Sequence, residues 1–171
     1  STVAYLKHIL LEHGYNVGTY TSPYIVRFNE RITTNYNDIT NEELLKYINI
    51  VYKLHSDVLL KHNQIITFFE LVTLISFLFF RDQNLDYCIY EVGLGGTLDA
   101  TNVVQPIICA ITSISYDHMG VLGNSLEEIA LNKLGIVKEH IPLVTAVQDE
   151  ELLPVFERIA TKKHSDLYLV K

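Results

Sequence analysis

Apolar residues recur every three or four positions over several stretches of the chain, which is the pattern of amphipathic helices. The expected helices cover residues 1–13, 40–62, 67–81, a segment that begins at 125, and 149–163. Two of these starts carry a capping box, in which a hydroxyl residue precedes a glutamate by three positions, at Thr40 and Ser125. Gly14 is expected to end the first helix, because glycine commonly follows the last helical residue.

Short runs that are apolar on both faces lie between these helices and predict buried strands. They cover residues 15–20, 86–91, 107–113, 141–146 and, more weakly, 167–170. Because such strands alternate with helices, we expect an α/β fold with three layers, αβα, built on one mostly parallel sheet. At 171 residues the chain is long enough for one domain with a full core. The polar, Asn-rich stretch 27–38 is too long for a plain connection, so a functional or disordered loop is expected there.

Lys133 interrupts the apolar face of the helix that begins at residue 125. Leu126, Ile129 and Val137 share that face, and Lys133 lies four residues from each of the last two. Because burial of an ammonium group is costly, part of this lysine is expected to be a free, nucleophilic amine. The alternative is a lysine whose alkyl stem lies on the core while its charged end reaches water.

Composition argues against several classes of function. The net charge of −7, with no cluster of Lys or Arg, argues against a nucleic-acid-binding protein. The most hydrophobic stretch, residues 65–80, is shorter than a membrane span and contains Glu70, so a core helix is expected there. Cys88 and Cys109 each lie in an apolar run and are expected to be buried free thiols, which favours a reducing, cytoplasmic setting.

Polar side chains follow three of the expected strands. Ser22 comes after the first strand, Glu91 and a Gly-rich run come after the second, and His118 comes after the third. Ligands bind beyond the carboxyl ends of the strands in an open parallel sheet, so these groups are expected to meet at one edge, next to the helix that carries Lys133. Each one alone has an ordinary explanation as a cap, a turn or a loop residue. Their coincidence at one edge favours a functional site.

These groups suit the binding of phosphate together with Mg²⁺. The oxygens of Ser22 and Glu91 are the hard ligands that Mg²⁺ prefers, with water and phosphate oxygens completing its octahedron. His118 is a less usual Mg²⁺ ligand and would need a second metal position or Mn²⁺. A zinc site is disfavoured, because no Cys/His spacing supports one.

Seven motifs within residues 1–145 carry a more specific signal. They are Ser1-Thr2-Val3-Ala4, Thr21-Ser22-Pro23-Tyr24 with Arg27-Phe28-Asn29-Glu30-Arg31-Ile32, Thr67-Phe68-Phe69-Glu70, Glu91-Val92-Gly93-Leu94-Gly95-Gly96, Leu98-Asp99-Ala100-Thr101-Asn102-Val103, Asp117-His118, and Lys133-Leu134-Gly135-Ile136-Val137-Lys138. In their order and spacing these motifs resemble the folylpolyglutamate synthase family, within the Mur ligase superfamily. The motifs are highly specific together, although no single one would be.

The resemblance implies that residues 1–171 are one fragment of a P-loop NTPase-like ATPase domain, taken from an ATP-dependent amide ligase. ATP would phosphorylate a carboxylate of a folate or a dihydropteroate. The amine of L-glutamate would then attack the acyl phosphate, forming an amide and releasing phosphate. The implied cofactors are ATP and Mg²⁺. A cytoplasmic monomer that binds neither nucleic acid nor membrane is expected.

The resemblance also implies roles for single residues. Ser1 resembles the serine that closes the family's phosphate loop. Ser22 and Glu91 resemble Mg²⁺ ligands, and His118 resembles a catalytic residue that binds a second metal ion. Lys133 resembles a catalytic lysine that is carbamylated, its amine having captured CO₂ to give an anionic oxygen donor for a second cation. The residues that resemble the pterin-binding surface are Thr67, Phe68, Phe69, Glu70 and Leu98.

The chain begins without methionine, inside an expected helix, and is expected to lack the start of the phosphate loop and the C-terminal domain. We therefore expect it to be catalytically inactive alone. Thr97, Gly120 and Asn132 depart from commoner residues of the family, which leaves fine substrate specificity open. Two other functions stay open: a Mur-type peptidoglycan ligase acting on a nucleotide-linked muramyl substrate, and a nucleotide-binding module without chemistry.

Overall fold

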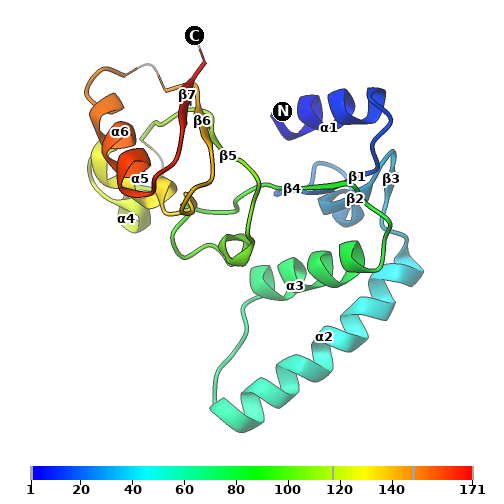
Figure 1. The fold of residues 1–171 in the computed structure, drawn as a ribbon. Helices are drawn as coiled ribbons and strands as arrows, with labels where there is room; N and C mark the ends of the chain where they lie inside the picture. The colour runs from blue at the N-terminus through cyan, green and yellow to red at the C-terminus, as the bar shows by residue number, and fades with distance from the viewer. Residues whose placement is uncertain (1, 117, 148, 171) are drawn as a thin grey trace. The chain divides into compact units, whose positions relative to one another are not determined.

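The structure is a computed structural model that describes residues 2–116, 118–147 and 149–170. The chain divides into two compact units, residues 1–93 and residues 94–171. Each unit has its own sheet and its own hydrophobic core. Figure 1 traces the elements of both units along the chain.

The first unit begins with α1 (Thr2–Glu12), β1 (Val17–Tyr20), the short 3₁₀ helix η1 (Phe28–Arg31), β2 (Ile32–Thr34) and β3 (Asn37–Asp38). It ends with α2 (Asn41–His62), α3 (Phe68–Arg81) and β4 (Tyr87–Tyr90). The strand order in its sheet is β3-β2-β1-β4. Strand β1 runs antiparallel to β2 and parallel to β4, so this sheet is mixed.

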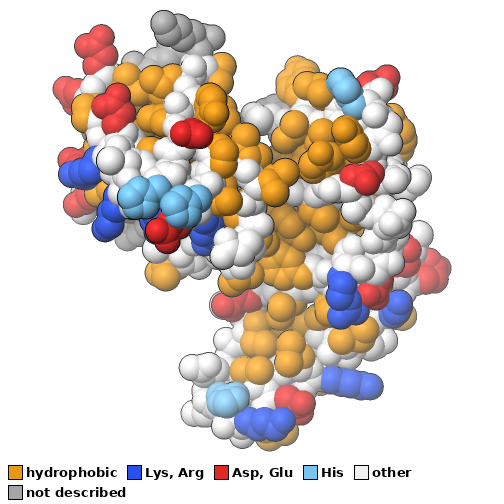
Figure 2. All heavy atoms as spheres, in the orientation of Figure 1, with side chains coloured by type: hydrophobic (Ala, Val, Ile, Leu, Met, Phe, Trp, Pro, Cys, Tyr) orange, Lys and Arg blue, Asp and Glu red, His pale blue; other side chains and the backbone are white. Residues whose placement is uncertain are grey.

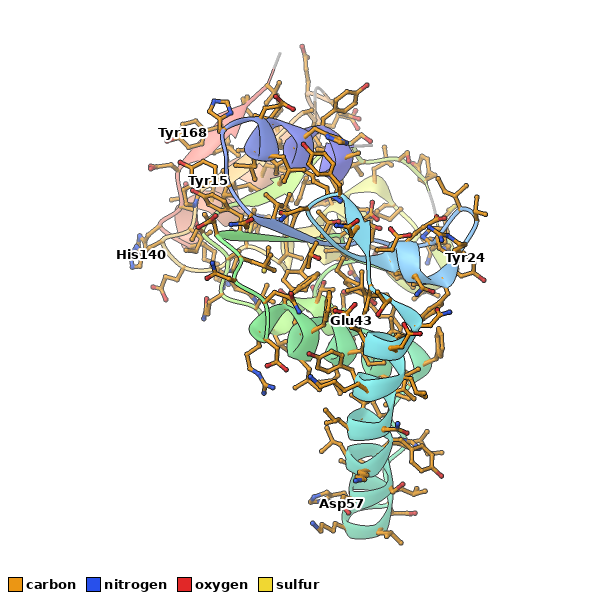
Figure 3. The ribbon with its side chains drawn as sticks, turned by 90° about the vertical axis from the view of Figure 1, so that its right-hand side faces the viewer. Tyr15, Tyr24, Glu43, Asp57, His140 and Tyr168 are labelled. Atoms are coloured by element: carbon orange, nitrogen blue, oxygen red, sulfur yellow. The ribbon has the colours of Figure 1, made fainter. Side chains whose placement is uncertain are left out.

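Side-chain caps fix the starts of the two long helices of this unit. Thr40 Oγ1 accepts a hydrogen bond from the Glu43 backbone N at 3.2 Å, and the Glu43 carboxylate accepts one from the Thr40 backbone N at 2.9 Å. Thr67 and Glu70 form the same reciprocal pair at the start of α3. The predicted capping box at Thr40 is confirmed, and the predicted helices 40–62 and 67–81 agree with α2 and α3. Figure 3 shows Glu43 at the beginning of α2 and Asp57 toward its far end.

Residues 27–38 form η1, β2 and β3, so the expected long loop is wrong. Ile32 and Thr33 are buried in β2, paired with Tyr20 and Thr19 of β1. Asn35, with a φ of 51°, turns the chain from β2 into β3. Strands of three and two residues are too short for their alternation to stand out among polar neighbours.

The core of the first unit forms where α3 packs against α2 and the sheet. Val72, Ile75, Phe79 and Phe80 of α3 are all buried, in keeping with the apolar sequence that predicted a core helix. Helix α1, in contrast, buries none of its residues. Apolar side chains also stay exposed over α2 and α3 on the face drawn in Figure 2.

The second unit contains η2 (Ala100–Val103), β5 (Cys109–Ile111), α4 (Met119–Leu122), α5 (Leu126–Leu134), β6 (Leu143–Thr145), α6 (Leu153–Lys162) and β7 (Leu167–Leu169). Its sheet consists of parallel strands in the order β5-β6-β7. Leu143 of β6 and Phe156 of α6 are completely buried at its centre. Leu134 and Val137, on either side of the turn that ends α5, belong to the same core.

The α/β class is confirmed, whereas the described residues form two smaller sheets in place of one clear three-layer sheet. Apolar runs identify strands but do not say which strands pair, so the prediction joined them all into one sheet. Cys109 is buried as predicted, but Cys88 is exposed on β4, the last strand of the first sheet. Both cysteines are free thiols, and burial raises the pKa of the Cys109 thiol. In the described part of the chain no helix has the length and hydrophobicity that a membrane crossing requires.

Candidate functional site

Ser22 and Glu91 meet at the carboxyl ends of β1 and β4. The two strands are parallel, with Tyr20 opposite Tyr90. The Glu91 backbone N donates to the Tyr20 carbonyl at 2.9 Å, which extends the pairing by one residue. The Ser22 backbone N donates to Glu91 Oε2 at 3.0 Å. The structure therefore confirms that these two predicted residues converge at the end of adjacent strands.

The chain after Ser22 is held by the carboxylate of Glu30. Three backbone N–H groups donate to this carboxylate, from Ile25 at 3.0 Å, Val26 at 3.2 Å and Arg27 at 2.9 Å. These bonds favour the ionised form and hold the pKa of Glu30 below its usual value. On the other side of the turn, the Thr21 backbone N donates to the Arg31 carbonyl at 2.9 Å. Ser22 is thus held between two ordered segments.

The donor set at this position fits Mg²⁺ together with phosphate. Ser22 carries a hydroxyl and Glu91 a carboxylate, and both groups are hard oxygen donors of the kind that Mg²⁺ prefers. No group of three or more His, Cys, Asp or Glu side chains that could hold a metal ion occurs among the described residues. A cation bound through one or two protein oxygens, with phosphate and water as its other ligands, matches this sparse set.

The first glycine of the run after Glu91 allows α3 to approach the end of β4. A Cβ at Gly93 would collide with the ring of Phe69. Phe69 also lies against Tyr20 of β1, with ring centroids 6.0 Å apart. The start of α3 is thereby packed directly beside the strand ends that carry Ser22 and Glu91.

The four residues predicted to bind a pterin at the start of α3 have different roles in the structure. Thr67 and Glu70 cap the helix, and the hydrogen bonds from Thr67 hold the pKa of Glu70 below its usual value. Phe69 is half-buried, whereas 66% of Phe68 is exposed. Only Phe68 therefore presents a largely open aromatic surface, and the substrate role of the group stays a prediction.

An aromatic and cationic cluster next to Phe68 was not among the predicted site residues. The rings of Phe28 and Phe68 lie 6.1 Å apart, and those of Tyr24 and Phe28 lie 5.9 Å apart. The guanidinium of Arg31 lies over both Tyr24 and Phe28, at 5.4 and 5.7 Å from the ring centroids. Figure 3 shows Tyr24 beside η1. Tyr24 and Phe28 of this cluster lie in one segment and Phe68 in another, so only the fold brings the three rings together.

In the second unit, His118 directly precedes α4 and lies beyond the carboxyl end of β5. It has a φ of 47° and is exposed to solvent. The predicted neighbour Asp117 lies outside the described residues. The meeting of His118 with the other predicted residues at the sheet edge, and its role as a metal ligand, stay predictions.

Lys133 lies in the last turn of α5 and is half-buried. Ile129 and Ala130 of α5 are buried, so the apolar face before Lys133 is confirmed. Val137 is buried too, but α5 ends at Leu134, so the prediction that Val137 shares this helix face is wrong. Ser125 caps the helix as predicted, accepting a hydrogen bond from the Glu128 backbone N at 3.2 Å. The second half of that capping box is wrong, because the Glu128 carboxylate accepts from the backbone N of Asn124 and not from that of Ser125.

Leu98, the remaining predicted substrate residue, is 96% exposed in the second unit. Ser22 and Glu91 belong to the first unit, whereas His118 and Lys133 belong to the second. A site that joins residues of both units stays a prediction. Ser1, predicted to contact the phosphates of ATP, lies outside the described residues.

Comparison with known proteins gives a consistent picture. Residues 1–170 match the family described as the Mur ligase middle domain. The chain is 48% identical, over 95% of its length, to a dihydrofolate synthase/folylpolyglutamate synthase of Bacillus subtilis.

Two solved structures have closely similar folds. A bifunctional folylpolyglutamate synthase/dihydrofolate synthase with Mn, AMPPNP and L-glutamate bound has a TM-score of 0.85 and 34% identity over 96% of the chain. A folylpolyglutamate synthase–AMPPCP–folate complex has a TM-score of 0.91 and 32% identity over the same share. The chain spans 38% of the Bacillus protein and 38% and 40% of the two solved chains.

Proposed function

Because the chain belongs to the Mur ligase middle-domain family, we propose that the full-length protein is an ATP-dependent ligase that adds L-glutamate to a folate. Acceptance of dihydropteroate as a second substrate is part of this proposal. The direct contact between Ser22 and Glu91 at the strand ends carries the proposal from the structure. The bound ligands of the similar proteins, a nucleotide analogue with L-glutamate in one and with folate in the other, support the substrate class.

The reaction consists of two displacements. The carboxylate of the folate attacks the γ-phosphorus of ATP, which releases ADP and leaves an acyl phosphate. The amine of glutamate then attacks the acyl carbon, phosphate leaves, and the nitrogen loses a proton to give the amide. A divalent cation held at this edge by Ser22 and Glu91 would neutralise part of the negative charge of the phosphates.

Each predicted residue has a defined task in this proposal. Ser22 and Glu91 hold Mg²⁺, and Ser1 closes the loop around the phosphates. His118 binds a second cation. The neutral amine of Lys133 adds CO₂ and releases a proton, so that the carbamate becomes an oxygen donor for that cation. The half-buried position of Lys133 in the last turn of α5, next to the buried Leu134, supports this task.

The pterin is proposed to lie against Phe68, with Phe69, Thr67, Glu70 and Leu98 around it. The exposed ring of Phe68 supports this assignment, since a flat heterocycle stacks on an open aromatic face.

The arrangement of the two sheets in the full-length protein is also part of the proposal. In the full-length protein both sheets would belong to one three-layer αβα domain over 1–171. The parallel pairing of β1 with β4 and of β5, β6 and β7 supports it.

A direct assay tests the proposed function. The full-length protein is incubated with Mg²⁺ and ATP, with folate or dihydropteroate, and with L-glutamate, and ADP release and product mass are measured. We expect ADP release that requires both acceptor and glutamate, and a product heavier by one glutamyl residue. Residues 1–171 alone are expected to show no turnover. Turnover with a muramyl nucleotide in place of the folate would reveal a peptidoglycan ligase, and ATP binding without ADP release would reveal a module without chemistry.

The same assay tests the role of Lys133. Lys133→Ala in the full-length protein should fold, as judged by circular dichroism, and lose turnover. An active alanine variant would remove the role assigned to Lys133 while leaving the reaction class in place.

We also propose that the protein acts as a cytoplasmic monomer. Its two free thiols support a reducing compartment.

A further inference from the structure

The last turn of α5, which carries Lys133, is bonded from outside by the segment after the Gly-rich run. The carbonyl groups of a helix's last turn have no donors within the helix. Here the Asn132 carbonyl accepts hydrogen bonds from both the backbone N and the Oγ1 of Thr97, each at 3.0 Å. The residue directly before Lys133 is therefore fixed to a second segment of the chain.

Asn102 extends this attachment to the other side of Lys133. Its Nδ2 donates to the Gly135 carbonyl at 3.1 Å and to the Thr97 carbonyl at 3.0 Å. Gly135 ends α5, two residues after Lys133. One amide group thus joins the end of the helix to the same segment that holds its preceding turn.

Lys138 fixes the orientation of the Asn102 side chain. Its Nζ donates to Oδ1 of Asn102 at 2.7 Å and to the Asn102 carbonyl, also at 2.7 Å. An ammonium group can only donate, so the amide oxygen must face Lys138. The amide nitrogen must then face Gly135 and Thr97. Asn102 and Lys138 are both half-buried, which limits the competition from water for these bonds.

Two glycines leave little room for movement at this contact. A Cβ at Gly96 would lie 2.7 Å from the Lys133 carbonyl oxygen, and one at Gly135 would collide with Thr97. Both approaches involve backbone atoms, which cannot swing away as a side-chain end can. Lys133 is therefore held through its backbone from both directions along the chain.

We propose that Asn102 is a positioning residue for Lys133, and that Lys138 supports it by fixing its amide. The inference rests on the proposed function, in which the Lys133 carbamate binds a cation. A long lysine side chain places its end group reproducibly only when the backbone beneath it is fixed, and ligands must be held to within about half an ångström. Asn102 would meet this requirement without touching substrate or metal.

The test uses the full-length protein and four variants. Asn102→Ala and Lys138→Met remove the two members of the contact. Asn49→Ala and Lys162→Met are control variants of the same residue types at exposed positions, Asn49 in α2 and Lys162 in α6. Measurements are kcat, the KM for ATP, the bicarbonate concentration that gives half-maximal activity, the melting temperature, and hydrogen exchange at the amides of Gly135 and Ile136.

We expect Asn102→Ala to lower kcat by about ten- to a hundredfold, the loss that small displacements in a catalytic site cause. The KM for ATP should change less than about twofold, because Ser22 and Glu91 are unaffected. The bicarbonate requirement should rise, since a misplaced carbamate loses its cation and reverts to the amine. Amide exchange at Gly135 and Ile136 should become faster. Lys138→Met should show the same changes to a smaller degree, and the controls none.

A variant that only melts at a lower temperature, with kcat and bicarbonate requirement unchanged, would overturn the proposal. If Asn102→Ala does not fold, Lys138→Met decides by the same measurements. Failure of the proposed function would look different. The wild-type protein would then release no ADP in the presence of a folate and L-glutamate. Failure of this inference alone leaves the wild type active, Lys133→Ala inactive and Asn102→Ala fully active.

Discussion

The two units hold their candidate residues in different ways. In the first unit, Ser22 and Glu91 touch each other directly at the ends of adjacent parallel strands. In the second, the backbone around Lys133 is fixed through bonds to Asn132 and Gly135. The contact between Ser22 and Glu91 involves only the two candidate ligands themselves. The position of Lys133, in contrast, depends on neighbouring residues that would not touch a ligand.

Loss of the direct pair should have the largest effect. Glu91→Gln in the full-length protein keeps an oxygen that can accept the Ser22 N–H but removes the charge that binds Mg²⁺. Because a bound metal ion contributes several kcal/mol to catalysis, we expect kcat to fall by at least about a hundredfold. ADP release is measured across a Mg²⁺ titration, with the exposed Glu139→Gln as control. An unchanged Mg²⁺ dependence would show that Glu91 binds no cation.

The Gly-rich run contains one glycine packed against a side chain and, three residues later, one packed against backbone. At Gly93 a Cβ would meet the ring of Phe69, whereas at Gly96 it would meet the carbonyl of Lys133. Overpacking typically costs about 1–3 kcal/mol. We expect Gly96→Ala to lie at the upper end and Gly93→Ala at the lower end, because a ring can shift and a backbone cannot.

Urea unfolding of the full-length protein measures both losses. Combining Gly93→Ala with Phe69→Leu should recover part of the stability lost at Gly93, since the smaller side chain leaves room for the new methyl group. No recovery in the double variant, or equal losses at the two glycines, would contradict the assigned contacts.

The helix caps separate a structural from a substrate role for Thr67. Thr40 and Thr67 both begin helices with a capping box, so replacing either with alanine should cost about 1 kcal/mol of stability. Only Thr67 is proposed to lie at the pterin surface. Thr67→Ala should therefore also raise the KM for the folate, whereas Thr40→Ala should leave it unchanged. Equal KM values in the two variants would reduce Thr67 to a cap.

Glu30 should give the smallest effect, visible only in acid. Its pKa is lowered from the ordinary value of 4.5 by three backbone N–H donors. A lowered pKa in the folded state means that the stabilisation is present above pH 4.5 and is lost as the pH falls below that value. The melting temperature should fall more steeply below this pH in the wild type than in Glu30→Gln. Parallel curves would show that this carboxylate contributes nothing to the acid sensitivity.

The sequence predicted the features that depend on local pattern. The capping box at Thr40 located the start of α2, and the apolar sequence located α3. The strand ends predicted the meeting of Ser22 and Glu91. It did not predict the β2–β3 hairpin, whose strands are too short to show an alternation. The division into two sheets was also missed, because an apolar run carries no record of its partner strand.

The contacts around Lys133 show a second limit. Asn102 lies more than thirty residues before Gly135 and Lys138 in the sequence, and it is joined to both by side-chain bonds. Only the fold reveals such a link. Gly96 was predicted only as one glycine of a Gly-rich run, but its lack of a side chain is required by the carbonyl of Lys133. The contact between Phe28 and Phe68 was missed for the same reason, because the two residues lie far apart in the sequence.

A crystal structure of the full-length protein with Mg²⁺, bicarbonate and a non-hydrolysable ATP analogue would show directly whether Lys133 is carbamylated. We expect electron density for a carbamate on Lys133, with a cation bound to it. A second cation should be bound to the Ser22 hydroxyl and the Glu91 carboxylate, beside the phosphates. An unmodified Lys133 that points into solvent, with the cations held by other residues, would contradict this expectation.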